Sequence, residues 1–441
     1  MTPGARIQAV IEILEQVWSG NQAADRVADM YFKKRRYAGS SDRRGIQGTL
    51  YEILRRRSRL DWWVARSGSS ITTGPRSRLI ANLALSDKSS PDQISTLFSG
   101  QNHCPDPLSE AEHQLADALY GRPLTHSDMP SSVALEYPEW MHASFSALWG
   151  DKLTTEISAL NQTAPVDVRV NTLKTTTEAA KAKLESQFIE TEYTPLSPIG
   201  LRLISKVRLG GTKAFRDGLV EVQDEGSQIL ALLCGAEPGM LVVDFCAGAG
   251  GKTLALAASM GSNGRIDGQL FACDISQSRI NRMEPRLKRA GATAVRRHAL
   301  TGTDDAWLKK AKGSVDRVLV DAPCTGTGAW RRDPNAKWHF TPQQLDDICT
   351  QQKNILADAA QLVKPGGRLI YATCSLLHEE NEQQLFDFLK NHDDFSPIPI
   401  DQVWSETIGG PPPPTGPCLR LSPASTGTDG FFCTVLERAT Y

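Results

Sequence analysis

The first residues that could do chemistry lie in the stretch DFCAGAGGKT, residues 244–253, which follows an apolar run and ends like a nucleotide-binding P-loop. A P-loop needs the pattern GxxxxGK[ST], because its first glycine lets the backbone curl around phosphates. Cys246 stands in place of that glycine. The dinucleotide pattern GxGxxG begins with Gly248 and Gly250 but needs a glycine where Thr253 stands. The sequence therefore disfavours a nucleotide hydrolase and a dinucleotide-binding enzyme.

The same stretch fits a different cofactor. Asp244 ends one predicted strand, a tight turn follows, and Asp274 ends the next strand 30 positions further on. An acid at the second strand end can accept hydrogen bonds from ribose hydroxyls, and the turn lets backbone approach a cofactor without phosphates. S-adenosylmethionine has this chemistry. The alternative is that the glycines merely make a tight turn.

Two cysteines directly follow the two remaining strands of the predicted sheet, Cys324 in DAPCTGTG and Cys374 in ATCS. A single buried cysteine is usually inert packing, but two at neighbouring strand ends face one crevice. A thiolate that adds to carbon 6 of a cytosine makes carbon 5 nucleophilic toward a sulfonium methyl group. Asp321 could bond the N3/N4 edge of the base, and a base, a water or the second thiol must then remove the carbon-5 proton. These residues predict methyl transfer to a cytosine.

Three regions must position these residues, and they predict a multidomain protein. We expect an α-helical domain at 1–125, a small α+β subdomain at 135–222, and an α/β doubly wound Rossmann-like domain at 223–441. The helical prediction rests on apolar residues at helical spacing, from Ile7 to Val17 and from Leu50 to Leu60. After residue 223, apolar strands alternate with amphipathic helices, which puts ligands at the carboxyl ends of the strands.

The composition of the 441-residue chain, with 40% hydrophobic and 22% charged residues, is typical of a globular protein. No run of 18 apolar residues occurs and the N-terminus does not look like a signal peptide, so we expect a cytoplasmic protein that spans no membrane. Nine cysteines without a CxxC pair predict reduced thiols and no metal cluster.

Charge is distributed unevenly along the chain. Residues 1–100 carry 16 Lys and Arg against 9 Asp and Glu, a net charge of +7 that leaves −8 for the rest. The clusters KKRR at 33–36 and RRRSR at 55–59 are either RNA contacts or solvated helix faces.

Five motifs in this order resemble those of the RNA (cytosine-5) methyltransferases of the RsmB/Sun/nucleolar-protein type: DFCAGAGGKT, ACDISQSRI, DAPCTGTGAWRRDPNAKW, YATCSLLHEENE and DGFF. The segments RVNTLK and VQDEGSQ are also similar, so the resemblance covers about residues 135–440. Residues 1–120 resemble, more weakly, a NusB-like RNA-binding domain.

The resemblance implies a role for each site residue. Cys374, in the Thr-Cys-Ser motif, would be the attacking thiol and Cys324 would help to release the product, although the Pro-Cys pair at 324 resembles the nucleophile of DNA cytosine methyltransferases. Asp274 would hold the ribose of S-adenosylmethionine, Arg279 would support that strand end, and Asp321 would lie between cofactor and base. The cofactor would also bind the turn formed by Cys246, Ala247, Gly248, Ala249, Gly250, Gly251 and Lys252. Lys252 would bond the target nucleotide or fix Asp321.

The chain departs from the family pattern in two places. Ala249 stands where the family usually has a proline. His298 and Ala299 occupy the slot of the acid that bonds the adenine amino group, so either Asp304 loops back or backbone groups replace that acid.

The favoured function is methyl transfer to carbon 5 of a cytosine in 16S ribosomal RNA by a monomer without metal. The same chemistry on transfer RNA is an alternative. A catalytically inactive RNA-binding assembly factor is a third, disfavoured because Asp321, Cys324 and Cys374 are all present.

Overall fold

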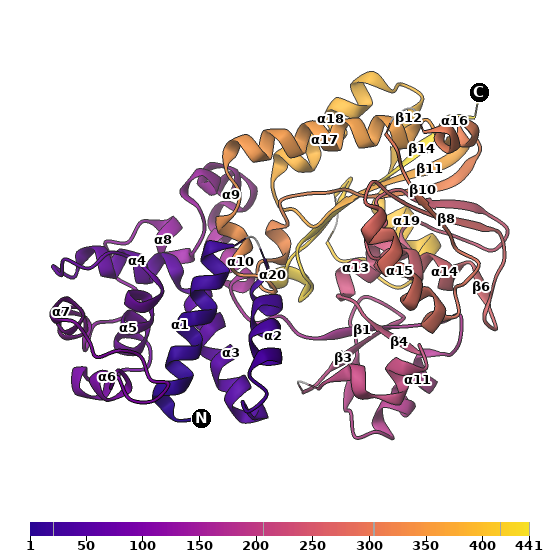
Figure 1. Ribbon diagram of the computed structural model, residues 1–441. Coiled ribbons are helices and arrows are strands. Elements are labelled where there is room, and N and C mark those ends of the chain that lie inside the picture. The colour runs from indigo at the N-terminus through magenta and orange to yellow at the C-terminus, as the bar shows by residue number, and fades with distance from the viewer. Residues whose placement is uncertain (21, 206, 303–304, 415, 441) are drawn as a thin grey trace. The chain divides into compact units, whose positions relative to one another are not determined.

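The computed structural model describes residues 1–441 except 21, 206, 303–304, 415 and 441. The chain forms two compact units: unit 1 is Met1–Asn161 with Trp330–Phe340, and unit 2 is Gln162–Ala329 with Thr341–Tyr441 (Figure 1). The predicted fold class is confirmed, because a helical region, a small α+β domain and a Rossmann-like sheet follow one another.

Unit 1 is helical. Its helices are α1 (Pro3–Ser19), α2 (Ala24–Lys34), α3 (Ser40–Arg55), α4 (Arg57–Arg66), α5 (Pro75–Leu85), α6 (Pro91–Leu97), α7 (Glu110–Leu119), α8 (Ser131–Leu135), α9 (His142–Trp149) and α10 (Leu153–Leu160). The apolar residues at helical spacing in α1 and α3 lie in its core, Ile7, Leu14 and Leu50 among them. Helix α1 begins after Thr2, whose hydroxyl accepts a hydrogen bond from the Ala5 N–H.

Unit 1 reaches beyond the predicted limit of residue 125, and it recruits Trp330–Phe340 from the middle of the methyltransferase-like sequence. Trp330 is 2% exposed and meets the Phe145 ring edge-on at 5.7 Å between centroids. Lys337 is buried, and its Nζ donates to the Glu136 carbonyl at 2.8 Å and to Asn161 Oδ1 at 3.1 Å. Because of these long-range contacts, Trp330–Phe340 belongs to unit 1 in space although it lies within the third predicted domain in sequence.

Unit 2 begins with a small domain, of which the described strands form an antiparallel sheet in the order β2-β3-β1-β4. Its elements are β1 (Asp167–Val170), α11 (Thr177–Glu185), β2 (Thr191–Tyr193), β3 (Gly200–Leu203), α12 (Lys213–Arg216) and β4 (Val220–Val222). Helix α11 begins after Thr176, which caps the Ala179 N–H. Strands and helices thus both occur within the region for which a small α+β subdomain is predicted.

The Rossmann-like part of unit 2 alternates strands and helices. Its elements are α13 (Glu225–Leu232), β5 (Leu241–Asp244), α14 (Gly251–Ser259), β6 (Gly261–Ser262), β7 (Arg265–Ile266), β8 (Gln269–Asp274), α15 (Gln277–Ala290), β9 (Arg296–Ala299), α16 (Ala306–Ala311), β10 (Val315–Asp321), α17 (Pro342–Ala360), β11 (Val363–Thr373), α18 (Glu382–Asn391), β12 (Phe395–Ile398), α19 (Ile400–Thr407), β13 (Leu419–Leu421), α20 (Pro423–Thr426) and β14 (Phe431–Arg438).

The described strands of the main sheet follow the order β12-β14-β11-β10-β5-β8-β9, with β13 also on β14. Strands β11, β10, β5, β8 and β9 are parallel, whereas β14 pairs antiparallel with β11. From β5 the chain builds outward to β8 and β9, and from β10 outward to β11, so the direction of winding reverses between β5 and β10. Ligands of such sheets bind outside the carboxyl ends of the strands at this reversal.

Both faces of the main sheet are covered by helices (Figure 1). Because side chains alternate along a strand, Val242 and Leu319 pack in a core with α13, α14, α15 and α19, whereas Val243 and Val320 pack in a core with α16, α17 and α18.

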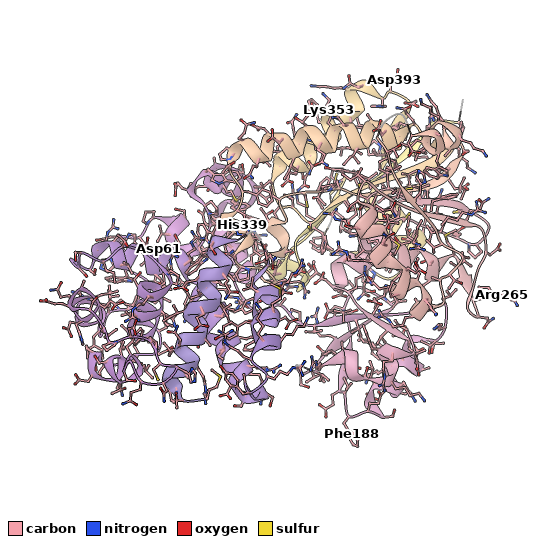
Figure 2. The ribbon with its side chains drawn as sticks, viewed as in Figure 1. Asp61, Phe188, Arg265, His339, Lys353 and Asp393 are labelled. Atoms are coloured by element: carbon pink, nitrogen blue, oxygen red, sulfur yellow. The ribbon has the colours of Figure 1, made fainter. Side chains whose placement is uncertain are left out.

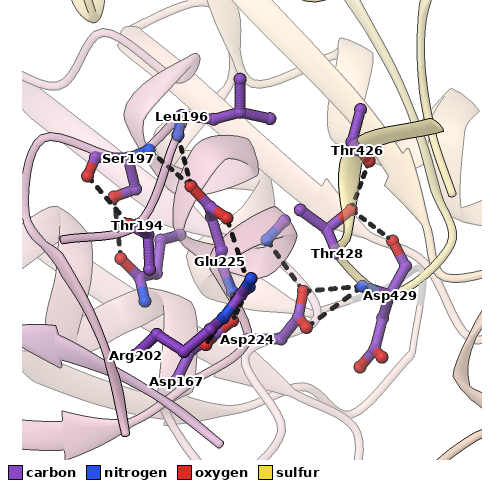
Figure 3. A network of polar contacts seen from close by, with 12 residues as sticks. Asp167, Thr194, Leu196, Ser197, Arg202, Asp224, Glu225, Thr426, Thr428 and Asp429 are labelled. Carbon is purple, nitrogen blue, oxygen red and sulfur yellow. Dashed lines mark hydrogen bonds and ion pairs between the residues drawn. The ribbon is translucent and has the colours of Figure 1, made fainter. Parts of the chain in front are cut away.

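A polar network ties the small domain to the start of α13 (Figure 3). The Asp167 carboxylate on β1 accepts Arg202 Nε at 2.7 Å and the Glu225 N–H at 3.2 Å. The Asp224 side chain caps α13 and accepts the Asp429 N–H at 3.1 Å, in the DGFF motif. The segment VQDEGSQ thus connects three separate parts of unit 2.

Candidate active site

Strands β5 and β10 bring two acids to the reversal point of the sheet. They are neighbours, with Leu319 opposite Asp244, and they end in Asp244 and Asp321. The predicted strand ends at Asp244 and Asp274 are confirmed, and the strands that precede the two cysteine motifs end at Asp321 and Thr373.

The turn after β5 depends on two glycines with positive φ. Gly248 and Gly250 have φ values of 55° and 86°, in the left-handed region that favours glycine. A Cβ on Gly250 would also lie 2.5 Å from Cγ of Met283, whereas one on Gly248 would meet nothing within 4 Å. The backbone at Gly248 is therefore open to an approaching molecule. The turn leads into α14, which starts at Gly251.

Asp274 is held beside this turn. Its Oδ2 accepts the Gly248 N–H at 2.9 Å, and its Oδ1 accepts the Ser276 N–H at 2.8 Å. Arg279 lies 3.8 Å from Oδ2 and is half exposed, so it contributes only a weak, solvent-screened interaction there. The carbonyl of Ala249 accepts Arg286 Nη1 at 2.5 Å, which fixes the other side of the turn.

A cavity of about 430 Å³ opens beside these strand ends. It is lined by Phe245, Cys246, Asp274, Ile275, Arg279, Leu300, Asp321, Pro323, Cys324, Gln351 and Ile355. This mixture of apolar walls and carboxylates, with an open glycine turn alongside, suits a small molecule with an adenosine part and a cationic part. The residues present therefore fit S-adenosylmethionine.

At the predicted adenine position, His298 and Asp305 pair with each other at 3.0 Å. The Asp305 carboxylate also accepts the Trp307 and Leu308 N–H groups at the start of α16. Burial opposes ionisation of Asp305, but these hydrogen bonds and those from Thr301 and His298 outweigh it, so its pKa is lowered. Asp304 lies outside the described residues. The apolar Leu300 reaches the cavity in this region.

Lys252 and Asp321 form a partly buried ion pair, with Nζ 2.6 Å from Oδ2. Burial disfavours the charged ammonium, but the Asp321 carboxylate outweighs that effect and the pKa of Lys252 is raised. The ammonium also interacts electrostatically with Cys374. Of the two roles predicted for Lys252, the structure contains the contact with Asp321.

The two predicted thiols are adjacent, with 3.3 Å between Cys324 Sγ and Cys374 Sγ. The hydrogen bond with Cys374 and burial both raise the pKa of the Cys324 thiol well above its ordinary value. Cys324 lines the cavity, whereas Cys374 is not among the lining residues and lies behind Cys324, in contact with its sulfur. The strand ends thus bring together Lys252, Asp321, Cys324 and Cys374.

Asp244 lies beneath this group and is fully buried. Its Oδ2 accepts the Thr253 hydroxyl at 2.6 Å. Burial raises the pKa of Asp244 to about 7, and the nearby Asp321 adds to the effect.

Several residues that hold the thiol loops had no predicted role. The Gly328 N–H donates to the Cys374 carbonyl at 2.9 Å, and the Gly430 N–H donates to the Gly328 carbonyl at 2.8 Å. A Cβ on Gly328 would lie 2.1 Å from the Gly430 carbonyl oxygen, so the two backbones touch only because both residues are glycine. The buried Glu380 binds both loops as well. The only feature of the sequence that could have pointed to these residues is that they lie in the motifs TGTG, HEENE and DGFF.

Among the described residues, no group of three or more His, Cys, Asp and Glu side chains is arranged to hold a metal ion. In the same part of the chain, none of the helices combines the length and apolar character needed to cross a bilayer.

Comparison with known proteins identifies the family. A family model described as "16S rRNA methyltransferase RsmB/F" matches residues 231–437, and the ferredoxin-like domain of RsmF/B-like methyltransferases matches residues 137–209. The "Probable ribosomal RNA small subunit methyltransferase B" of Synechocystis is 33% identical over 306 residues, 69% of this chain and 67% of that protein. The chain belongs to the RsmB/F methyltransferase family. This confirms the resemblance inferred from the motifs.

A second relative gives the same family. The "Ribosomal RNA small subunit methyltransferase B" of Pasteurella multocida is 34% identical over 287 residues, which is 64% of this chain and 61% of that protein. The alignments therefore span about two thirds of these curated relatives.

Two solved structures are similar in fold. The crystal structure of PH0851 superposes with a TM-score of 0.79 and 26% identity over 99% of both chains. A methyltransferase homolog from Pyrococcus horikoshii superposes with a TM-score of 0.59 and 26% identity, over 70% of this chain and 97% of that one.

Proposed function

We propose that this RsmB/F family member transfers a methyl group from S-adenosylmethionine to carbon 5 of a cytosine in 16S ribosomal RNA, through a covalent bond between Cys374 and carbon 6. The observation that carries the proposal is the pair of sulfurs 3.3 Å apart, of which that of Cys324 belongs to a residue that lines the same cavity as Asp321. The names of the relatives support ribosomal RNA of the small subunit as the substrate. The reaction would take place in the cytoplasm.

Cys374 is the nucleophile in this proposal. The ammonium of Lys252 interacts electrostatically with its sulfur. The thiolate forms a bond to carbon 6, and the electrons of the 5,6 double bond move into the ring so that carbon 5 becomes nucleophilic. S-adenosylmethionine, when bound, supplies the electrophilic methyl group that carbon 5 takes up.

Asp321 orients the base. Its Oδ2 is occupied by Lys252, while its location on the cavity wall leaves it within reach of an entering cytosine. A carboxyl group there bonds the N3/N4 edge and stabilises charge that develops in the ring. The ion pair with Lys252 keeps the carboxyl group in one orientation.

Cys324 removes the proton from carbon 5 after methyl transfer. The hydrogen bond with Cys374, burial and the charge of Cys374 raise the pKa of Cys324, in that order. When Cys374 forms its bond to carbon 6, it no longer offers that hydrogen bond or that charge, so Cys324 can lose its proton to solvent more easily. The resulting Cys324 thiolate takes the carbon-5 proton as the bond between Cys374 and carbon 6 breaks. The 5,6 double bond returns, and Cys374 leaves as a thiolate.

The small domain is a proposed RNA contact. Phe188, in the turn that follows α11, is 97% exposed and points away from the domain (Figure 2). Tyr193 on β2 is also exposed. Exposed aromatic rings can stack on the bases of unpaired RNA.

The test uses the full-length chain with methyl-labelled S-adenosylmethionine, a 16S ribosomal RNA transcript, and a transfer RNA pool as a separate substrate. Digestion to nucleosides and mass spectrometry should find labelled 5-methylcytidine in the 16S transcript. If labelled 5-methylcytidine appears in transfer RNA alone, the substrate is transfer RNA and not 16S ribosomal RNA. Label in any other nucleoside would overturn the proposed chemistry.

A further inference from the structure

The carboxylate of Glu380 binds the residues that directly follow both thiols. It lies in the short 3-10 turn η6 (His378–Glu380) and is fully buried. Its Oε1 accepts the Thr325 N–H at 2.8 Å, next to Cys324, and its Oε2 accepts the Thr325 hydroxyl. The Ser375 hydroxyl, next to Cys374, also donates to Oε2.

A fourth donor completes the arrangement. Gln352 on α17 donates from Nε2 to Glu380 Oε1 at 3.1 Å and to the Pro323 carbonyl at 2.8 Å. Gln352, Thr325 and Ser375 are each at most 2% exposed, so water does not compete for these bonds. A buried carboxylate that accepts four hydrogen bonds restrains the groups that donate them.

Burial of the Glu380 carboxylate is by itself unfavourable. Removal from water raises the pKa of Glu380, while the hydrogen bonds from Ser375, Thr325 and Gln352 favour its ionised form. An apolar residue would fill the same interior space without that cost, but it could not hold two separate loops by their polar groups. The contacts thus suggest a positional role rather than a contribution to stability alone.

We propose that Glu380 is a positioning residue that keeps the sulfurs of Cys324 and Cys374 in contact by binding Thr325 and Ser375 together. The proposal rests on the function proposed above, because the spacing of the sulfurs matters for two thiols that react in sequence on one base. Glu380 itself does not line the cavity, so it acts through its neighbours.

The sulfur spacing can be measured without any methyl transfer. Diamide takes two electrons and two protons from a pair of thiols, is reduced to a hydrazine, and leaves a disulfide. Two sulfurs 3.3 Å apart need only a small shift to reach the bond length of about 2 Å. The rate at which the Cys324–Cys374 cross-link forms, followed by mass spectrometry of peptides, therefore reports how well the loops are held.

The variants remove either the Glu380 acceptor or the hydroxyl groups that donate to it. Glu380→Ala removes the acceptor, and Thr325→Val with Ser375→Ala removes both hydroxyl donors but leaves the carboxylate in place. Glu380→Gln is the conservative rescue, because the amide keeps an acceptor for the Thr325 N–H and the two hydroxyls can turn to accept from its NH₂ group. Glu379→Gln, on the same turn, is the matched control.

We expect Glu380→Ala and the Thr325→Val/Ser375→Ala variant to slow the cross-link and to lower kcat by roughly tenfold or more, since misplacement of reacting groups by about 1 Å is costly. KM for S-adenosylmethionine should stay unchanged, Glu380→Gln should restore much of both rates, and Glu379→Gln should match the unmodified chain. If Glu380→Ala does not fold, the Thr325→Val/Ser375→Ala variant provides the test.

Cross-linking at the unmodified rate in the Thr325→Val/Ser375→Ala variant would overturn the proposal, whatever the catalytic result. An equal fall in the Glu379→Gln control would overturn it too, because the effect would then not be specific to the hydrogen bonds of Glu380. Slow cross-linking in the variants of a chain that makes no 5-methylcytidine would support the positional role while removing the proposed function.

Discussion

The two compact units use their charged side chains in different ways. In unit 2, the charges of Asp321 and Lys252 pair at the cavity edge, where they can act on a bound molecule. In unit 1, the basic run RRRSR turns inward: Arg59 pairs with the buried Glu136, and Arg57 lies over the rings of Trp18 and Trp338. A run of like charges in a sequence therefore does not by itself identify a nucleic-acid surface.

The other basic cluster of unit 1 differs in the exposure of its side chains. In KKRR, the side chains of Lys33, Lys34 and Arg36 are exposed, while Arg35 pairs with Glu12. Of the two clusters, KKRR is thus the one available to RNA. The comparison predicts that changes in unit 2 affect chemistry, changes in RRRSR affect stability, and changes in KKRR affect RNA affinity.

The largest effect is expected for Cys374→Ala. Loss of the attacking thiol should lower methyl transfer by roughly 10³-fold or more, because in the proposed mechanism Cys374 forms the covalent bond and Cys324 acts only as the base. Thermal unfolding should change little, and Cys104→Ala in unit 1 serves as the control for loss of a thiol. Turnover within about tenfold of the unmodified chain would make the assignment of the nucleophile wrong.

Arg59→Met tests the inward role of RRRSR. The variant leaves the buried Glu136 carboxylate without the cation that donates to it at 2.9 Å, so unit 1 should lose about 3 kcal/mol of unfolding free energy. Urea denaturation measures the change. The matched variant Arg36→Met, at an exposed position, should stay within about 0.5 kcal/mol of the unmodified chain. Equal stability of both variants would contradict the contrast between the clusters.

Lys33→Gln/Lys34→Gln/Arg36→Gln tests the outward role of KKRR. Removal of three exposed cations should weaken binding to 16S RNA by roughly tenfold and reduce the steepness of its salt dependence, because fewer counterions are released. Affinity measured across a salt series checks both effects. Unchanged affinity and an unchanged salt slope would remove KKRR as a contact.

Asp244→Asn should have a pH-dependent effect on unit 2. The pKa of Asp244 is about 7 in the folded chain against 3.8 as its ordinary value. At pH values between these two pKa values, Asp244 holds a proton in the folded chain that it has lost in the unfolded chain. Its contribution to the stability of the folded state is therefore full below about pH 4 and is lost as the pH rises through 7. The variant should therefore gain stability relative to the unmodified chain by at most about 1.4 kcal/mol per pH unit over that window. A constant difference from pH 4 to 8 would contradict the assignment.

The sequence predicted the strand ends because their signals are local. An apolar run that stops at Asp244 or Asp321 marks both a buried strand and its functional edge, and glycines such as Gly248 mark the turn. Parallel strands then bring these ends together whatever the details of packing. The adjacency of Cys324 and Cys374 follows from the same rule.

What could not be predicted depends on contacts between distant residues. Glu380 resembles any charged residue of a polar turn until the fold buries it between two loops. Lys337 belongs by sequence to the motif after Cys324, yet its ammonium is buried in unit 1 against the Glu136 carbonyl. The inward turn of Arg57 and Arg59 has no local signature either.

The most direct test of the central claim is a denaturing gel of Cys324→Ala incubated with 16S RNA and S-adenosylmethionine. Without the Cys324 base, the bond between Cys374 and carbon 6 should persist, and a slowly migrating protein–RNA band should appear. The band should vanish in Cys324→Ala/Cys374→Ala. A band that survives in the double variant, or normal turnover of Cys324→Ala without any band, would contradict the account.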